Sequence, residues 1–174
     1  LAVANHFADS VSVLLGDGTG SLGAKTDFAT GSNPFSVAID DVNGDGNADL
    51  AAANSGSATV SVLLGTGTGA FGAKTDFATG TGARSVAIGD LDRDGKPDLA
   101  VANPGSGTVS VLLGDGAGAF GAKTDFGTGA DPRSLAIGDL NGDGNPDLAV
   151  TNAGSATVSV LLNTTAIAPF GAFE

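Results

Sequence analysis

Three loops of the 174-residue chain carry the side chains best suited to chemistry, because each gathers several short, oxygen-bearing residues. Each loop has Asp or Asn at its first, third and fifth positions, glycine at its sixth and aspartate at its ninth; the loops span 41–49, 90–98 and 139–147. Calcium takes about six to eight oxygen ligands at about 2.3–2.6 Å, and such side chains on alternate positions can converge on one ion. The glycine permits a sharp reversal, which turns the carbonyl of position seven inward. The spacing therefore predicts three calcium sites, one in each loop.

A metal-free turn is the alternative interpretation, because Asp, Asn and Gly are also common turn residues. The three loops hold ten of the 19 acidic residues, in groups of three, four and three, and carboxylates this close repel one another without a cation. An EF-hand would have an acidic residue at position twelve, where this chain has Ala52, Val101 and Val150, so the loop is a β-hairpin form of the site. We expect Lys96 to contribute only its backbone carbonyl, and calcium to fit this ligand-rich loop better than magnesium.

Composition and charge exclude several other classes of site and partner. The chain has no Cys and a single His, so a disulfide framework, a cysteine nucleophile and a multi-histidine metal site are excluded. Its net charge of −12 predicts no binding to nucleic acid, whose phosphates would be repelled. The sequence contains no run of about 18 apolar residues, so we expect no membrane insertion.

The elements that must hold these loops follow from an internal repeat. Residues 36–46 return as 85–95 and 134–144, a step of 49 residues on both occasions. Self-similarity at such a period is typical of propellers and other repeat architectures. We therefore treat 1–174 as a single array of about three and a half repeats: 1–35 (partial), 36–84, 85–133 and 134–174 (partial).

Each repeat is predicted to contain four short strands between glycine-rich turns. In the third repeat we expect strands over 85–88, 98–102 and 108–113, and one within 120–128. No helical apolar stripe is present, so almost no helix is expected. The pattern predicts an all-β fold, a β-propeller of four-stranded antiparallel blades, with the first strand of each unit innermost. Phe71, Phe120 and Phe170 are expected to pack between blades.

The segment from Ser85 to Asn103, which includes Asp90-Leu91-Asp92, resembles the FG-GAP/VCBS repeat of the integrin α-subunit propeller and of many bacterial surface proteins. Phe71-Gly72 and Phe120-Gly121 are similar to its Phe-Gly element, and the likeness extends over nearly the whole chain. The resemblance implies that positions one, three, five, seven and nine of each loop bind calcium: Asp41, Asn43, Asp45, Asn47, Asp49, Asp90, Asp92, Asp94, Lys96, Asp98, Asp139, Asn141, Asp143, Asn145 and Asp147. It also implies a binding function, such as cell adhesion, carbohydrate recognition or scaffolding.

These features predict a calcium-binding, extracellular or cell-surface module for binding or adhesion, in which calcium stiffens the blade hairpins and no reaction is catalysed. Calcium loops of this kind suit the higher calcium concentrations outside cells. A protein or glycan ligand should bind the face opposite the calcium loops. That face would present residues 5–9, 54–58, 103–107 and 152–156, with Arg84 and Arg133.

Two other functions stay open at this point. A carbohydrate-binding lectin propeller is the main alternative, although the chain lacks the Trp and Tyr that commonly stack on sugars. A part of a polysaccharide-degrading enzyme is a remote alternative, because the calcium sites already engage the clustered carboxylates.

An open array of blades would leave strand edges and apolar blade faces exposed at its ends. We therefore predict a homodimer that completes a ring of about seven or eight blades. A segment of a longer propeller is the alternative.

Overall fold

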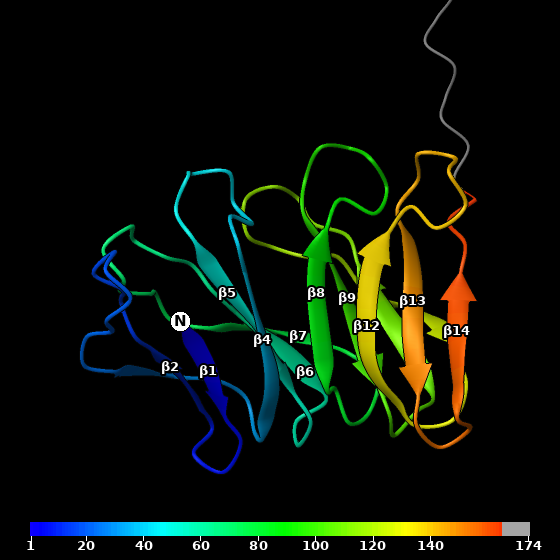
Figure 1. Ribbon diagram of the computed structural model, residues 1–174, viewed down its shortest axis with the longest axis horizontal. Helices are drawn as coiled ribbons and strands as arrows, with labels where there is room; N and C mark the ends of the chain where they lie inside the picture. Colours follow the sequence, from blue (N-terminus) through cyan, green and yellow to red (C-terminus); the bar gives the residue numbers. More distant parts are fainter. Residues whose placement is uncertain (165–174) are drawn as a thin grey trace, which may run out of the picture.

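The computed structural model describes residues 1–164, and within this range the chain forms fourteen β-strands and no helix (Figure 1). Their bounds are β1 Ala2–Asn5, β2 Ser10–Val13, β3 Thr26–Ala29, β4 Pro34–Asp40, β5 Asp49–Asn54, β6 Thr59–Leu63, β7 Thr75–Ala78, β8 Ser85–Gly89, β9 Asp98–Asn103, β10 Thr108–Leu112, β11 Thr124–Gly127, β12 Pro132–Gly138, β13 Asp147–Asn152 and β14 Thr157–Leu161. The strands of the third repeat begin and end within about two residues of the predicted ones, and the fourth lies inside its predicted window.

The strands form four antiparallel sheets, which we call blades 1 to 4 in chain order. Blade 1 is β1-β2-β3, blade 2 is β4-β5-β6-β7, blade 3 is β8-β9-β10-β11, and blade 4 is β12-β13-β14. The first strands of successive repeats lie together, since β4 contacts β8 and β8 contacts β12. This arrangement confirms the all-β, propeller-like fold with the first strand of each unit innermost.

The second strand of each complete blade lies at the centre of its sheet and is buried on both faces. Every residue of β5 and β9 is buried, which explains why these strands read Asp-Leu-Ala-Ala-Ala-Asn and Asp-Leu-Ala-Val-Ala-Asn. Small alanines let neighbouring blades approach closely, while Leu50 and Leu99 fill the space between the sheets. These rigid central strands begin with the ninth residue of a predicted metal loop.

Phenylalanine side chains connect adjacent blades, as the sequence predicted for Phe71 and Phe120. The ring of Phe71 meets Phe28 of blade 1 edge-to-face at a centroid distance of 5.0 Å. Phe120 meets Phe77 of blade 2 in the same way at 5.3 Å. Such pairs stabilise packing beyond the area that they bury. Phe170, the third predicted residue of this kind, lies outside the described residues.

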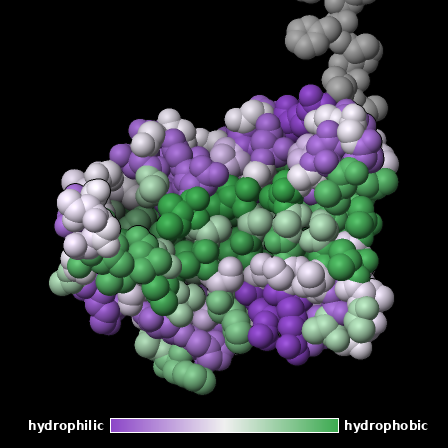
Figure 2. All heavy atoms as spheres, in the orientation of Figure 1, coloured by the Kyte–Doolittle hydropathy of each residue, from purple (hydrophilic) through white to green (hydrophobic). Residues whose placement is uncertain are grey.

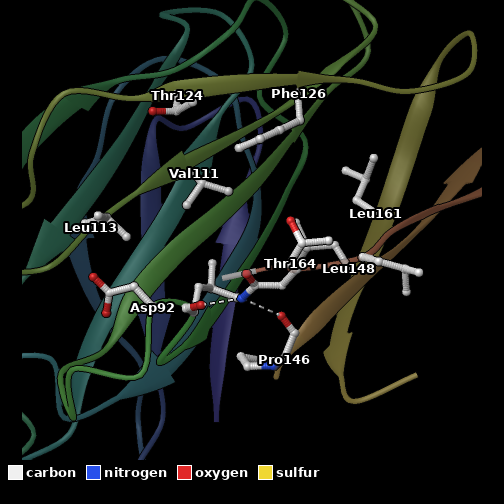
Figure 3. Close-up of a pocket in the computed structure, with 12 residues that line it drawn as sticks. Asp92, Val111, Leu113, Thr124, Phe126, Pro146, Leu148, Leu161 and Thr164 are labelled. Atoms are coloured by element: carbon white, nitrogen blue, oxygen red, sulfur yellow. Dashed lines mark hydrogen bonds between the residues drawn. The ribbon is translucent and has the colours of Figure 1, made fainter. Parts of the chain in front are cut away.

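Blades 3 and 4 enclose a pocket of about 360 Å³, lined by apolar side chains of both blades (Figure 3). Its lining includes Val111, Phe126, Leu148 and Leu161. The residues 49 positions earlier, Val62, Phe77, Leu99 and Leu112, belong to the core cluster that holds Phe120. The pocket is therefore the third copy of the groove between blades.

Candidate metal centres

The three predicted loops lie at the same end of the array. Each joins the innermost strand of a blade to the next strand: β4 to β5, β8 to β9 and β12 to β13. Figure 1 shows these connections at the top of the view, while the β5–β6 and β13–β14 connections lie at the bottom. The fold thus separates the aspartate loops from the face on which we expect a ligand.

The first aspartate of each loop is surrounded by the backbone of its own loop. Asp41 accepts hydrogen bonds from the amides of Gly44 and Gly46, both at 2.7 Å. Asp139 accepts the two equivalent bonds at 2.7 and 2.9 Å. Asp90 accepts only one of these bonds: its Oδ2 accepts the amide of Gly95, at position six, at 2.9 Å. Its Oδ1 is buried without a hydrogen-bond partner. A buried carboxylate oxygen with no donor is costly unless a cation or another donor satisfies it.

The loop reversal uses two left-handed residues, and the spacing of the sequence predicts one of them. The glycines at position six have φ of 82°, 84° and 82°, as the spacing predicted. Position four is also left-handed, with φ of 75° at Gly44, 79° at Gly142 and 65° at Arg93. Glycine at this position in two of the three loops is the sequence signal that was missed. Arg93 adopts a conformation that costs a non-glycine residue about 1–2 kcal/mol.

The ninth aspartate has a structural role that the sequence alone did not indicate. Asp98 is fully buried, and its Oδ2 accepts the amide of Leu91 at 2.7 Å. Its Oδ1 accepts the amide of Gly114, at the end of β10, at 2.8 Å. Asp49 and Asp147 are equally buried and accept the two equivalent bonds in their own blades. This residue therefore joins the loop to the third strand of its blade.

Three carboxylates converge in the second loop. One oxygen from each of Asp90, Asp92 and Asp98 lies within 4.8 Å of the other two. Burial raises the pKa of Asp98 against the lowering effect of its backbone hydrogen bonds, and the neighbouring Asp92 carboxylate raises it further. The cluster could therefore hold a metal ion, and the unpartnered Oδ1 of Asp90 supplies an oxygen that a cation would satisfy.

Positions five and seven pack against each other within the loop. The Oδ1 atoms of Asp45, Asp94 and Asp143 accept the amides of position seven at 2.7, 2.9 and 2.7 Å. The side chain of Lys96 forms an ion pair that the sequence did not predict, because its Nζ lies 2.8 Å from Asp94 Oδ2. This ammonium group lowers the pKa of Asp94 and offsets one of the four acidic charges of the second loop.

The first and third loops have an amide in place of the carboxylate at position three. Asn43 Nδ2 donates to Asp45 at 3.1 Å, and its Oδ1 accepts the Asp45 amide at 3.0 Å. Asn141 makes the same two contacts with Asp143, each at 2.9 Å. These loops therefore hold three acidic residues each, with amide groups oriented among them.

The Lys-Thr-Asp sequence that recurs in three repeats, and the glycine-rich turn at Asp17, form ordinary surface contacts. Lys25, Lys74 and Lys123 pair with the aspartates two residues later: Asp27, Asp76 and Asp125. Asp17 accepts the amide of Thr19 at 2.8 Å, a hydrogen bond within its own hairpin turn. Within residues 1–164, no helix is long and apolar enough to cross a membrane.

Repeated antiparallel blades, three of which carry an aspartate loop between their first two strands, define a repeat protein with a β-propeller-like fold. The profile of the FG-GAP-like repeat matches residues 1–52, 41–101 and 90–150, and the chain belongs to this family. No curated protein matches the chain.

Two solved structures share the fold. A lectin from Agrocybe aegerita, described as recognising non-reducing terminal N-acetylglucosamine, is 23% identical with a TM-score of 0.58; the match covers 95% of this chain and 50% of the lectin. A chain of the Photorhabdus luminescens Tc holotoxin pore is 18% identical with a TM-score of 0.51, over 94% of this chain and 8% of that one. The present chain thus spans half of the lectin and a small part of the toxin chain.

Proposed function

We propose that the chain is a calcium-binding, non-catalytic module of an extracellular or cell-surface protein, and that it binds a protein or glycan partner. The observation that carries the calcium assignment is the convergence of Asp90, Asp92 and Asp98, with one buried Asp90 oxygen lacking a hydrogen bond. The other two loops repeat its spacing and its buried ninth aspartate. All of these ligands are oxygens, the type that calcium prefers.

Calcium has a mechanical role in this proposal. Asp98 contacts both its loop and the end of β10, so an ion bound to Asp98 would restrain the first three strands of blade 3 together. Asp49 and Asp147 do the same in blades 2 and 4. By restraining the strands, the ions would also restrain the loops at the other end of the blades, where we expect the ligand. Loops held on a rigid scaffold lose less entropy when a ligand binds.

A second copy of the chain is the proposed partner at the ends of the array. Val158, Val160 and Leu162 of blade 4 are 62%, 53% and 51% exposed. At the other end, Leu1 and Val3 are 62% and 41% exposed. Figure 2 shows an apolar band that crosses the array between hydrophilic upper and lower surfaces. Two copies that meet end to end would cover these residues and close a ring.

Calorimetric titration of the chelated protein tests the proposed function. We expect about three calcium ions to bind each chain, and magnesium to bind much more weakly because it requires a stricter octahedral shell. The matched variant Asp90→Asn should lose one site, that of blade 3. Absence of calcium binding, or equal binding of magnesium, would contradict the assignment.

A further inference from the structure

On the face opposite the metal loops, the start of the array has aromatic ring side chains at positions where the later repeats have none. His6-Phe7 stands where the later repeats have small residues: Ser55-Gly56, Pro104-Gly105 and Ala153-Gly154. Phe35 stands where the later repeats have Arg84 and Arg133. The repeats are otherwise similar, so the three ring side chains of His6, Phe7 and Phe35 distinguish this part of the array from the later repeats.

The fold brings these departures together. The His6 ring meets Phe7 at 4.7 Å and Phe35 at 4.6 Å, both edge-to-face. The guanidinium carbon of Arg84 lies 4.1 Å from the centre of the Phe35 ring. These four residues come from three separate segments: the β1–β2 connection, the start of β4 and the residue before β8. Figure 1 shows the β1–β2 connection at the bottom of the view, opposite the metal loops.

Local structure fixes the cluster in place. Phe35 lies at the register shift between Pro34 and Ser36, and an irregularity of this kind redirects a side chain. Asn33 donates from its amide side chain to the carbonyl of His6 at 3.1 Å, which ties the β1–β2 connection to the start of β4. A partner would therefore meet a preformed surface and would lose less entropy on binding.

Burial does not explain the exposed rings. Phe7 is 94% exposed and Phe35 is 42% exposed. At the position equivalent to Phe7 in blade 2, a Cβ on Gly56 would lie 2.4 Å from Asn33 Oδ1, so a side chain there would have to displace that of Asn33. The first blade has room for a side chain at this position. The residue there, Phe7, is large and apolar, and its side chain is exposed to solvent.

Arg84 has a charge that no neighbouring group neutralises. Within residues 1–164 it is the only Lys or Arg without a hydrogen bond or ion pair from its side chain. The others have polar partners: Lys25, Lys74, Lys96, Lys123 and Arg133 pair with aspartates, and Arg93 donates to Asn145. The donors of Arg84 are free on a chain whose net charge is −12. A planar guanidinium is well suited to bind a carboxylate through two parallel hydrogen bonds.

We propose that His6, Phe7, Phe35 and Arg84 form a docking surface for an acidic peptide segment of a partner protein, in which a carboxylate lies beside an apolar side chain. The carboxylate pairs with Arg84, and the apolar side chain covers Phe7. Exposed aromatic residues next to arginine are typical of the residues that dominate protein–protein interfaces, whereas small-molecule sites are concave. This inference rests on the proposed function as a binding module and names the partner's chemistry.

An array of short synthetic peptides tests the proposal. The peptides combine Asp or Glu with Leu or Phe, and each has a counterpart with Asn or Gln; a glycan array that includes uronic acids is probed in parallel. The variants are Phe7→Gly, which installs the residue of the other repeats, and Arg84→Gln. Lys123→Gln is the charge-matched control. It also removes one positive charge, but Lys123 directly precedes β11, outside the proposed docking surface, and pairs with Asp125.

We expect acidic peptides to bind and their amide counterparts not to bind, because only a carboxylate pairs with the Arg84 guanidinium. Phe7→Gly and Arg84→Gln should each weaken binding about tenfold or more, the scale of an interface hot spot, without changing the melting temperature. Lys123→Gln should change neither. Equal binding of acidic and amide peptides, signals from glycans alone, or no binding at all would overturn the proposal.

The outcomes also separate this inference from the proposed function. Peptide binding that Phe7→Gly and Arg84→Gln leave unchanged would overturn this surface but would support a binding module that uses another one. Loss of the calcium response with acidic-peptide binding intact would overturn the calcium assignment and leave this surface standing.

Discussion

The buried carboxylate of Asp98 accepts a hydrogen bond from the amide of Gly114 at 2.8 Å, and this contact joins the metal loop to the end of β10. The same relationship recurs between Asp49 and Gly65 at 2.6 Å and between Asp147 and Asn163 at 2.8 Å. A residue selected by sequence as a metal ligand is thus also part of the fold. Mutation can separate this structural role from the proposed metal binding.

Asp98→Asn should destabilise the protein even when no metal is bound. An amide keeps one acceptor oxygen but places an NH₂ group against a backbone amide, so one buried donor loses its partner. We expect a loss of about 2 kcal/mol in the free energy of unfolding, measured by denaturant titration in EDTA. Asp92→Asn is the control, because an amide oxygen can still accept the Asp94 amide that now bonds to Asp92 at 3.1 Å. Equal stability of the two variants in EDTA would contradict the structural role of Asp98.

Gly114→Ala should disturb the same contact from its other side. A Cβ at Gly114 would lie 2.1 Å from the carbonyl oxygen of Pro97, so the backbone must move. We expect a cost of about 1–3 kcal/mol, together with weaker calcium binding in blade 3. Gly127→Ala is the matched control, because no atom lies within 4 Å of its added Cβ. The explanation fails if the two alanine variants melt at the same temperature.

The left-handed conformation of Arg93 predicts a difference between two substitutions. Both Arg93→Gly and Arg93→Ala remove the hydrogen bond from Arg93 to Asn145 at 3.2 Å, but only glycine also relieves the strain at φ of 65°. The glycine variant should be more stable than the alanine variant by about 1 kcal/mol. Thermal melting of both proteins in EDTA gives the difference directly. An alanine variant that matches the glycine variant would show that this backbone position is unstrained.

The sequence predicted the features that depend on local spacing. The four strands of the third repeat, the packing of Phe71 and Phe120 between blades, and the turn at Gly95 all follow from periodicity and residue type. The partners in contacts between distant residues were not predictable in this way. The bond from Asp98 to Gly114 spans 16 residues, and the stacking of Arg84 on Phe35 spans 49. The contacts of the His6 ring with Phe7 and Phe35 are a further case, because Phe35 is 29 residues away in the sequence.

Light scattering tests whether a second copy completes the ring. With calcium present at micromolar protein concentration, we expect twice the chain mass of 16.6 kDa, because the exposed strand β14 and the face of blade 1 would cover each other. Val160→Asp should give a monomer that still binds calcium, since Val160 is 53% exposed and distant in sequence from every loop ligand. A wild-type mass near 16.6 kDa would exclude the shared ring under these conditions.

Thermal melting with and without calcium tests the central claim, that metal ions bound to the aspartate loops stabilise this fold. A ligand that binds only the folded state contributes about 2.7 kcal/mol per site at a hundredfold excess over its Kd, and its removal leaves the clustered carboxylates unneutralised. We expect the melting temperature to fall in excess EDTA, to recover fully on addition of calcium, and to recover poorly with magnesium. A melting curve that EDTA leaves unchanged, with the absence of bound metal verified by elemental analysis, would contradict the account.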